Sequence, residues 1–254
     1  MKVTVGDGMA ATTTGSPLAY TPRFDFRDLQ LIVAEYTDPA GRERELSETF
    51  GSMRWLWSQD EYVRFDRDTR ELRSLTFFVP ARCVSAAADR GPRTRAAGLR
   101  ADDVGEFGMP QTEVFHCGAG AGALTCLVDV RLLGGEPDAR LGVAPGVDLL
   151  VYEGVVAGWS LGDPARYLTD GFAEPPSGPP APATRLRLAE CLELVSSPLV
   201  DRVMDSDPEA WQRLRVVERA LREQREDRGR ADVLHAVISR LIEDYEGRDG
   251  PTLT

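Results

Sequence analysis

The chain has 254 residues, of which 42% are hydrophobic and 28% are charged, a composition that is ordinary for a globular protein. Its length suits one large domain or two small ones. The formal net charge of −11 argues against nucleic acid and anionic membranes as partners, because such polyanionic surfaces would repel the chain.

The basic residues and the cysteines indicate the cellular setting. Arginine supplies every basic residue except Lys2, a bias expected from a bacterial, GC-rich genome. We find no apolar run typical of a signal peptide, and the longest apolar stretch, residues 147–161, is interrupted by Asp148 and Glu153. We therefore expect an acidic cytoplasmic protein whose cysteines stay reduced. These cysteines are Cys83, Cys117, Cys126 and Cys191.

The first part of the chain predicts a tail followed by strands. Residues 1–22 are rich in Thr, Gly and Ala and predict a flexible tail, with a short strand at Lys2–Val5. Asp28–Tyr36 predicts a strand that ends at the turn signal Thr37–Gly41. The next two predicted strands are Glu43–Phe50 and Met53–Ser58.

Three predicted hairpins follow. In the clearest one, Val147–Tyr152 and Val155–Leu161 are joined by the two-residue turn Glu153-Gly154. Between the other two, residues 86–112 are charged and rich in Gly and Pro, which predicts a long surface loop. These other hairpins are Glu61–Phe65 with Glu71–Val79, and Val114–Cys117 with Ala123–Leu132.

The hairpins resemble one another. Val63-x-Phe65 followed by leucines is similar to Phe115 followed by leucines, which suggests an internal repeat of residues 23–85 and 113–168. Both ranges would belong to one β-rich body over residues 23–170. Unrelated hairpins also look alike, so that alternative stays open.

The pattern changes after the body. Residues 171–184 contain five prolines and predict an extended linker. Residues 185–254 predict a helical region, with helices over Arg185–Ser196, after the capping box Ser206–Glu209 and along the apolar stripe from Val233 to Tyr245. We therefore expect an α+β fold, in which antiparallel β-meander sheets precede a C-terminal helical segment.

One segment resembles a catalytic motif. Gly158-Trp159-Ser160-Leu161-Gly162 fits the G-x-S-x-G pattern of serine hydrolases, and His235 follows in the chain order that such enzymes use. The context does not fit, because the preceding strand belongs to an antiparallel hairpin and the later residues are helical. A serine hydrolase that uses Ser160 with His235 is therefore only the alternative function.

No metal or cofactor is expected. His116, Cys117 and Cys126 share a predicted hairpin, but their spacing matches no structural zinc pattern. The glycine-rich run Gly118–Gly122 precedes a strand instead of a helix, so it cannot bind a dinucleotide phosphate in the usual way. Aspartates such as Asp66 are explained by turn formation.

The main hypothesis is a non-catalytic interaction protein. Its acidic charge suits another protein with a basic surface, as in an immunity or antitoxin-like inhibitor or an accessory protein of a gene cluster. Trp55 and Trp57 share one strand face, where they pack in the core or form a recognition patch. Together with Trp159 they are the candidate binding residues of a further alternative, a small-molecule binding protein with a pocket between two β-units.

Overall fold

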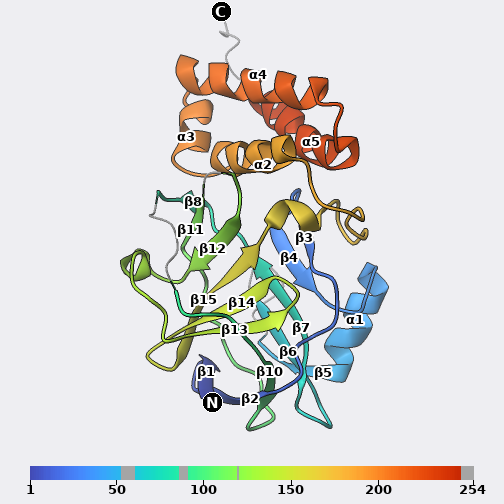
Figure 1. Ribbon diagram of the computed structural model, residues 1–254, viewed down its shortest axis with the longest axis vertical. Coiled ribbons are helices and arrows are strands. Elements are labelled where there is room, and N and C mark those ends of the chain that lie inside the picture. The colour runs from blue at the N-terminus through green and yellow to red at the C-terminus, as the bar shows by residue number, and fades with distance from the viewer. Residues whose placement is uncertain (53–60, 86–90, 119, 247–254) are drawn as a thin grey trace, which may run out of the picture.

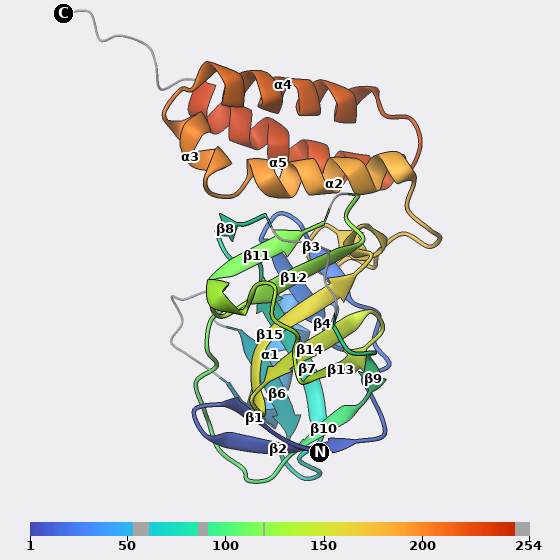
Figure 2. The same cartoon turned by 60° about the vertical axis from the view of Figure 1, so that its left-hand side comes forward.

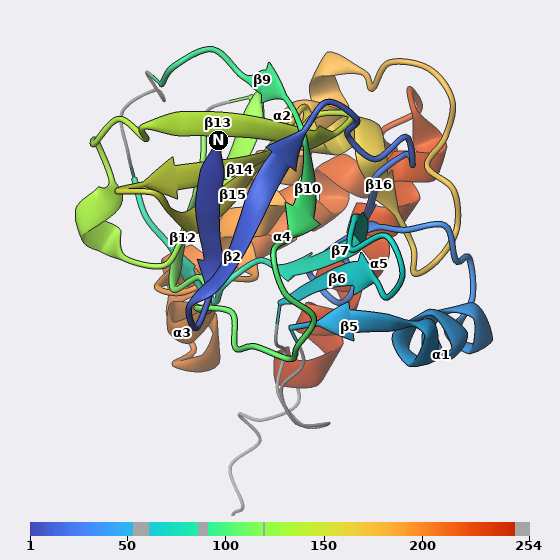
Figure 3. The same ribbon diagram turned by 90° about the horizontal axis from the view of Figure 1, so that it is seen from below.

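The computed structural model describes residues 1–52, 61–85, 91–118 and 120–246. Two β-sheets form a body, and helices α2 to α5 lie across one end of it (Figure 1). Seen from the opposite end, β2 and β10 of the larger sheet lie on one side of the body and β5 to β7 of the smaller sheet on the other (Figure 3). The fold is α+β, as the sequence predicts.

The smaller sheet belongs mainly to the first half of the chain. Its strand order is β16-β3-β4-β7-β6-β5. All neighbours are antiparallel except β16 and β3, which run parallel. The strands are β3 (Arg23–Asp25), β4 (Gln30–Val33), β5 (Thr49–Gly51), β6 (Tyr62–Asp66), β7 (Leu72–Phe78) and β16 (Leu168–Thr169).

The larger sheet repeats this order in the second half. Its strands follow the path β8-β11-β12-β15-β14-β13, and again only the first pair, β8 and β11, is parallel along that path. The two halves therefore share one topology, in which β11–β12 corresponds to β3–β4 and not to β6–β7, the hairpin that the sequence comparison matched to it. The strands are β8 (Arg82–Cys83), β11 (Val114–Cys117), β12 (Ala123–Leu127), β13 (Ala139–Ala144), β14 (Val147–Tyr152) and β15 (Val155–Gly162).

The sheets are mixed, which corrects the expected antiparallel meander. Meanders occur only locally, in β5–β6–β7 and in β13–β14–β15. Each half sends its last strand into the sheet of the other half: β8 leaves the first half to pair with β11, and β16 leaves the second half to pair with β3. A strand that crosses between sheets in this way lies parallel to its new neighbour.

The predicted N-terminal tail contributes two strands to the larger sheet. β1 (Lys2–Gly6) pairs in parallel with β15, and β2 (Met9–Thr14) lies between β1 and β10 (Gly98–Ala101). Val5 and Ala11 are fully buried. The small side chains of this stretch give a weak apolar pattern, although its β-branched threonines favour a strand. Within the predicted long loop, β9 (Arg95–Ala96) also pairs with β13.

The predicted strand over Glu43–Phe50 is wrong, because most of it forms helix α1 (Pro39–Glu48). The Asp38 carboxylate accepts a hydrogen bond of 2.7 Å from the Gly41 amide, and proline occupies the first turn. Asp at the N-cap followed by proline is a helix start, which the sequence analysis interpreted as a turn. The other predicted strand, Met53–Ser58, lies outside the described residues.

Two equivalent aromatic residues meet between the sheets. Phe77 in β7 and Trp159 in β15 stack with ring centroids 5.4 Å apart and an interplanar angle of 12°. Each occupies the same place in its own half, since each continues a cross-strand row that begins with a phenylalanine. The rows are Phe24–Leu31–Phe77 and Phe115–Cys126–Trp159.

The helical region follows the prediction closely, with one added helix. Its members lie beyond the ends of β8, β11 and β12 (Figure 2). The Asp207 carboxylate, not Ser206, caps α4 by accepting a hydrogen bond from the Ala210 amide. The helices are α2 (Pro182–Leu194), α3 (Leu199–Met204), α4 (Pro208–Glu223) and α5 (Arg228–Glu246). Within the described residues, every helix is too short or too polar to cross a membrane.

Arg230 fastens the proline-rich segment to the helices. Its guanidinium is 2% exposed and donates to the Asp227 carboxylate at 2.9 Å and to the carbonyls of Pro176 and Gly178 at 2.7 and 3.0 Å. It also donates to the carbonyl of Arg166 at 3.3 Å. A charged group with several acceptors holds an otherwise irregular segment in one conformation.

Replacing this guanidinium with an apolar side chain tests its role. We expect Arg230→Met to lower the free energy of unfolding by about 1–3 kcal/mol, because the half-buried Asp227 carboxylate loses a charged donor. Urea unfolding gives the stability, and limited proteolysis gives the cleavage rate within residues 171–181. Arg240→Met is the control, since Arg240 lies on the same helix with an exposed side chain. Equal cleavage in both variants would contradict the anchoring role.

Candidate functional site

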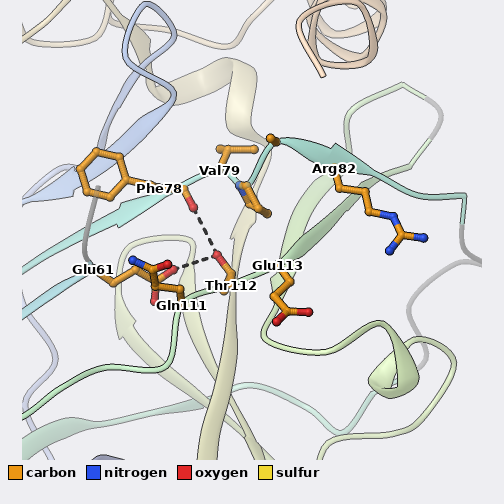
Figure 4. Close-up of a pocket in the computed structure, with 9 residues that line it drawn as sticks. Glu61, Phe78, Val79, Arg82, Gln111, Thr112 and Glu113 are labelled. Carbon is orange, nitrogen blue, oxygen red and sulfur yellow. Dashed lines mark hydrogen bonds between the residues drawn. The ribbon is translucent and has the colours of Figure 1, made fainter. Parts of the chain in front are cut away.

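A cavity of about 420 Å³ lies where the first half crosses to the sheet of the second half. Its walls combine the crossing segment between β7 and β8, the residues that lead into β11, and one glutamate before β6 (Figure 4). Cavities of this volume accommodate small ligands. The lining residues are Glu61, Phe78, Val79, Pro80, Ala81, Arg82, Gln111, Thr112 and Glu113.

Backbone hydrogen bonds fix the walls. The Val79 amide donates to the Leu29 carbonyl at 2.8 Å, which extends the pairing of β7 with β4. The Glu113 amide donates to the Leu127 carbonyl at 2.8 Å, which extends the pairing of β11 with β12. Pro80 lies between β7 and β8, and because proline lacks an N–H it ends the ladder there. The cavity opens where the ladder stops.

Glu61 is the buried polar group of this site. It is 4% exposed, and its Oε1 accepts hydrogen bonds from Thr112 Oγ1 at 2.9 Å and from Trp159 Nε1 at 3.2 Å. The Thr112 hydroxyl also lies 3.3 Å from the Phe78 carbonyl. A hydroxyl has a single hydrogen, so Thr112 donates to only one of these two oxygens at a time.

The environment of Glu61 favours its neutral form. Burial raises the pKa of its carboxyl from 4.5 to about 7, and the hydrogen bonds from Thr112 and Trp159 offset this effect only in part. At neutral pH the carboxyl is therefore poised between its two protonation states. Buried carboxyls of this kind are found more often at functional sites than elsewhere.

The strand register explains why Glu61 points into the core. The Tyr62–Thr76 pair ends the ladder of β6 and β7 on this side. Continuing the antiparallel register by one residue places Glu61 opposite Phe77. Residues that face each other across antiparallel strands project to the same side of the sheet. Glu61 therefore projects toward the second sheet, where Trp159 reaches it.

The second half of the chain shows which residue occupies the position equivalent to Glu61. Phe77 and Trp159 are equivalent in the two sheets, and Trp159 pairs with Leu149 of β14. Leu149 is thus the counterpart of Glu61, and it is 1% exposed. An aliphatic side chain satisfies the same place in the shared topology, so the fold itself does not require a carboxyl there.

The structure separates the two residues of the hydrolase alternative into different environments. Ser160 lies inside β15, where it is 4% exposed and pairs with Thr125 on one side and Asp148 on the other, both antiparallel. A nucleophile elbow instead needs a sharp strand-to-helix turn between parallel strands. His235 lies on α5, and its Nε2 is 3.1 Å from the Glu218 carboxylate.

The candidate tryptophans have different outcomes. Trp159 is 1% exposed and belongs to the core, but its indole N–H reaches the site through Glu61. Trp55 and Trp57 lie outside the described residues, so their assignment to core or binding surface stays a prediction.

The cysteines and histidines do not form a metal centre within the described residues, where no group of three or more suitable side chains comes together. Cys126 and Cys191 are buried. Burial raises the pKa of the Cys83 thiol to about 11 and that of Cys117 to about 12. Both thiols are therefore protonated at neutral pH, which makes them poor nucleophiles.

No known protein family, curated protein or solved structure matches this chain. The chemistry of the site has to be inferred from its own residues. Sequence reasoning did not identify Glu61, because a glutamate at the edge of a predicted strand looks like an ordinary solvent-exposed residue. The suggested repeat gives no signal either, because it compares Val63 and Phe65 with the hairpin of Phe115, whereas the structure makes Leu149 the counterpart of Glu61.

The raised pKa makes the stability depend on pH. Because the carboxyl of Glu61 binds its proton more tightly in the folded chain, its contribution to stability is full below pH 4.5 and is lost as the pH rises through about 7. The loss amounts to roughly 3 kcal/mol. We expect Glu61→Gln, whose carbonyl still accepts both hydrogen bonds, to be more stable than the parent at pH 8 and similar to it at pH 5.

Urea unfolding at the two pH values measures this difference. Glu136→Gln is the matched control, because Glu136 is exposed and does not line the cavity. The control should keep the pH dependence of the parent chain. The explanation fails if Glu61→Gln and Glu136→Gln show the same change in stability between pH 5 and pH 8.

The position of Ser160 gives a second prediction. We expect a fluorophosphonate probe to leave Ser160 unlabelled, because Ser160 lies inside a strand that is paired on both sides, whereas the reactive serine of such a hydrolase lies on a sharp strand-to-helix turn. Mass spectrometry of the treated protein measures the modification, with a serine hydrolase as the positive control. Labelling that disappears in Ser160→Ala would restore the hydrolase alternative.

Proposed function

We propose that this chain is a non-catalytic binding protein that takes an organic cation into the cavity at Glu61. The observation that carries the proposal is a buried carboxyl, at the edge of an open cavity, in a position where the second half of the chain has Leu149. Burying a carboxyl without a charged partner is unfavourable. A ligand cation would supply that partner.

The other lining groups suit the same ligand. The Phe78 carbonyl and the Glu61 carboxylate can both accept hydrogen bonds from a donor in the cavity, since Thr112 occupies only one of them at a time. Ammonium and guanidinium groups offer three and five N–H donors respectively and accept none. An anionic ligand would instead meet the carboxyls of Glu61 and Glu113.

Two sources of the cation fit this chemistry. The first is a lysine or arginine side chain on the basic surface of another protein, which the net charge of −11 would attract. The second is a free small molecule. Both would act in a reducing cytoplasm, the setting in which the four free thiols persist. An immunity-like or accessory role would follow from the first source.

Titration with small cations tests the proposal. We expect n-butylammonium or n-butylguanidinium to bind at pH 8 and to bind less tightly at pH 5, by up to about a hundredfold, because Glu61 must lose its proton to pair with a cation. Isothermal titration calorimetry measures the affinity, and Glu136→Gln should bind like the parent chain.

The site variant separates specific binding from general attraction. Glu61→Gln should weaken binding at pH 8 by about thirtyfold or more, the cost of removing one partner of a buried charge pair. A lysine- or arginine-rich peptide titrated in parallel distinguishes a protein side chain from a free molecule. Equal binding of all ligands by Glu61→Gln and the parent would refute the proposal.

A further inference from the structure

The cavity has a charge pattern from its buried end to its mouth. Glu61 lies at the buried end, whereas Glu113 and Arg82 are exposed and line the same cavity. Figure 4 shows Glu61 and Arg82 on opposite sides, with Thr112 and Glu113 between them. The lining therefore offers two carboxylates and one guanidinium, of which the Glu61 carboxylate is buried and the other two groups are exposed.

Arg82 and Glu113 lie on neighbouring segments of the larger sheet. Arg82 pairs with Val114 across the parallel β8–β11 ladder, so Glu113 is adjacent to its partner residue. The helical region adds a second support, because the Ser197 amide donates to the Ala81 carbonyl at 2.7 Å and the Cys83 amide donates to the Ser197 carbonyl at 2.9 Å. Arg82 thus lies on a backbone that is bonded on both edges.

Apolar residues also line the cavity, beside the polar Gln111 and Thr112. Phe78, Val79 and Pro80 line it, and methylene groups of a ligand would bury their surface against such residues. Alkyl stems of basic side chains commonly pack in this way while their charged ends find polar partners. A ligand that fits must therefore carry charges at both ends of a short aliphatic chain.

We propose that the cavity binds a dibasic amino acid, with its side-chain cation at Glu61, its α-ammonium at Glu113 and its α-carboxylate at Arg82. The two negative charges and one positive charge of the lining complement the two positive charges and one negative charge of such a ligand. This inference rests on the proposed function, because it assigns the ligand of the same site.

Other cations satisfy the pattern less well. A diamine leaves Arg82 facing a second positive charge, and like charges in close contact oppose binding. A lysine or arginine within a protein chain has neither a free α-ammonium nor a free α-carboxylate, so the mouth charges would gain no partner from it. The α-carboxylate is thus the group that distinguishes the inferred ligand.

Matched ligands and variants test each contact. Arginine, agmatine, N-acetylarginine and citrulline differ in the α-carboxylate, the α-ammonium or the side-chain charge, and each is titrated by calorimetry at pH 8. We expect arginine to bind about three- to fivefold more tightly than agmatine, as is usual for one solvent-exposed ion pair. Citrulline, whose side chain is neutral, should bind about thirtyfold more weakly than arginine or not at all.

Each variant should abolish the preference of the site for one ligand over another. Arg82→Met should bind arginine and agmatine equally, and Glu113→Gln should bind arginine and N-acetylarginine equally. Arg240→Met, an exposed arginine on α5 outside the cavity lining, is the control and should keep both preferences. Circular dichroism of each variant checks the fold, and agmatine binding by Arg82→Met shows that its cavity is intact.

The outcomes separate this inference from the proposed function. If n-butylguanidinium binds through Glu61 but arginine and agmatine bind equally to the parent chain, the site takes cations and the assignment to an amino acid is wrong. If no cation binds through Glu61, both proposals fail. A preference for arginine over agmatine that persists in Arg82→Met would also overturn the assigned orientation.

Discussion

Each half of the β-rich body completes its sheet with a strand from the other half. β8 belongs by sequence to the first half but pairs with β11, and β16 belongs to the second half but pairs with β3. The sheets cannot separate without breaking these backbone hydrogen bonds and the stacking of Phe77 on Trp159. The cavity is a consequence of this exchange, because one wall is the segment that crosses from β7 to β8.

The sequence predicts those parts of the fold that local patterns determine. The hairpin of β14 and β15 was predictable because two residues, Glu153 and Gly154, separate two apolar runs. In the structure both residues adopt the positive φ that such a turn needs. The helices after residue 181 were predictable from their apolar period. The strand exchange was not, since no local pattern states which distant strand will be a neighbour. The cap at Asp38 was misread because Asp-Pro also begins turns.

The candidate site was beyond sequence reasoning for the same reason. Glu61 receives its hydrogen bonds from Thr112 and Trp159, which lie 51 and 98 positions away in the chain. Its burial depends on the register of β6 with β7 and on the approach of the second sheet. The motif around Ser160 was visible in the sequence, but antiparallel neighbours on both sides give that serine an ordinary strand position.

Glu61 affects folding and binding through the same quantity, which is the free-energy cost of burying its charge. In the folded chain the ionised carboxylate is poorly solvated, so at neutral pH the carboxyl is either protonated or destabilises the fold. Total stabilities of single domains are only about 5–15 kcal/mol, which makes a cost of roughly 3 kcal/mol a substantial fraction. Leu149 occupies the equivalent place without this cost. A ligand cation at Glu61 would favour the ionised carboxyl and stabilise the fold at the same time, because any ligand that binds only the native state does so.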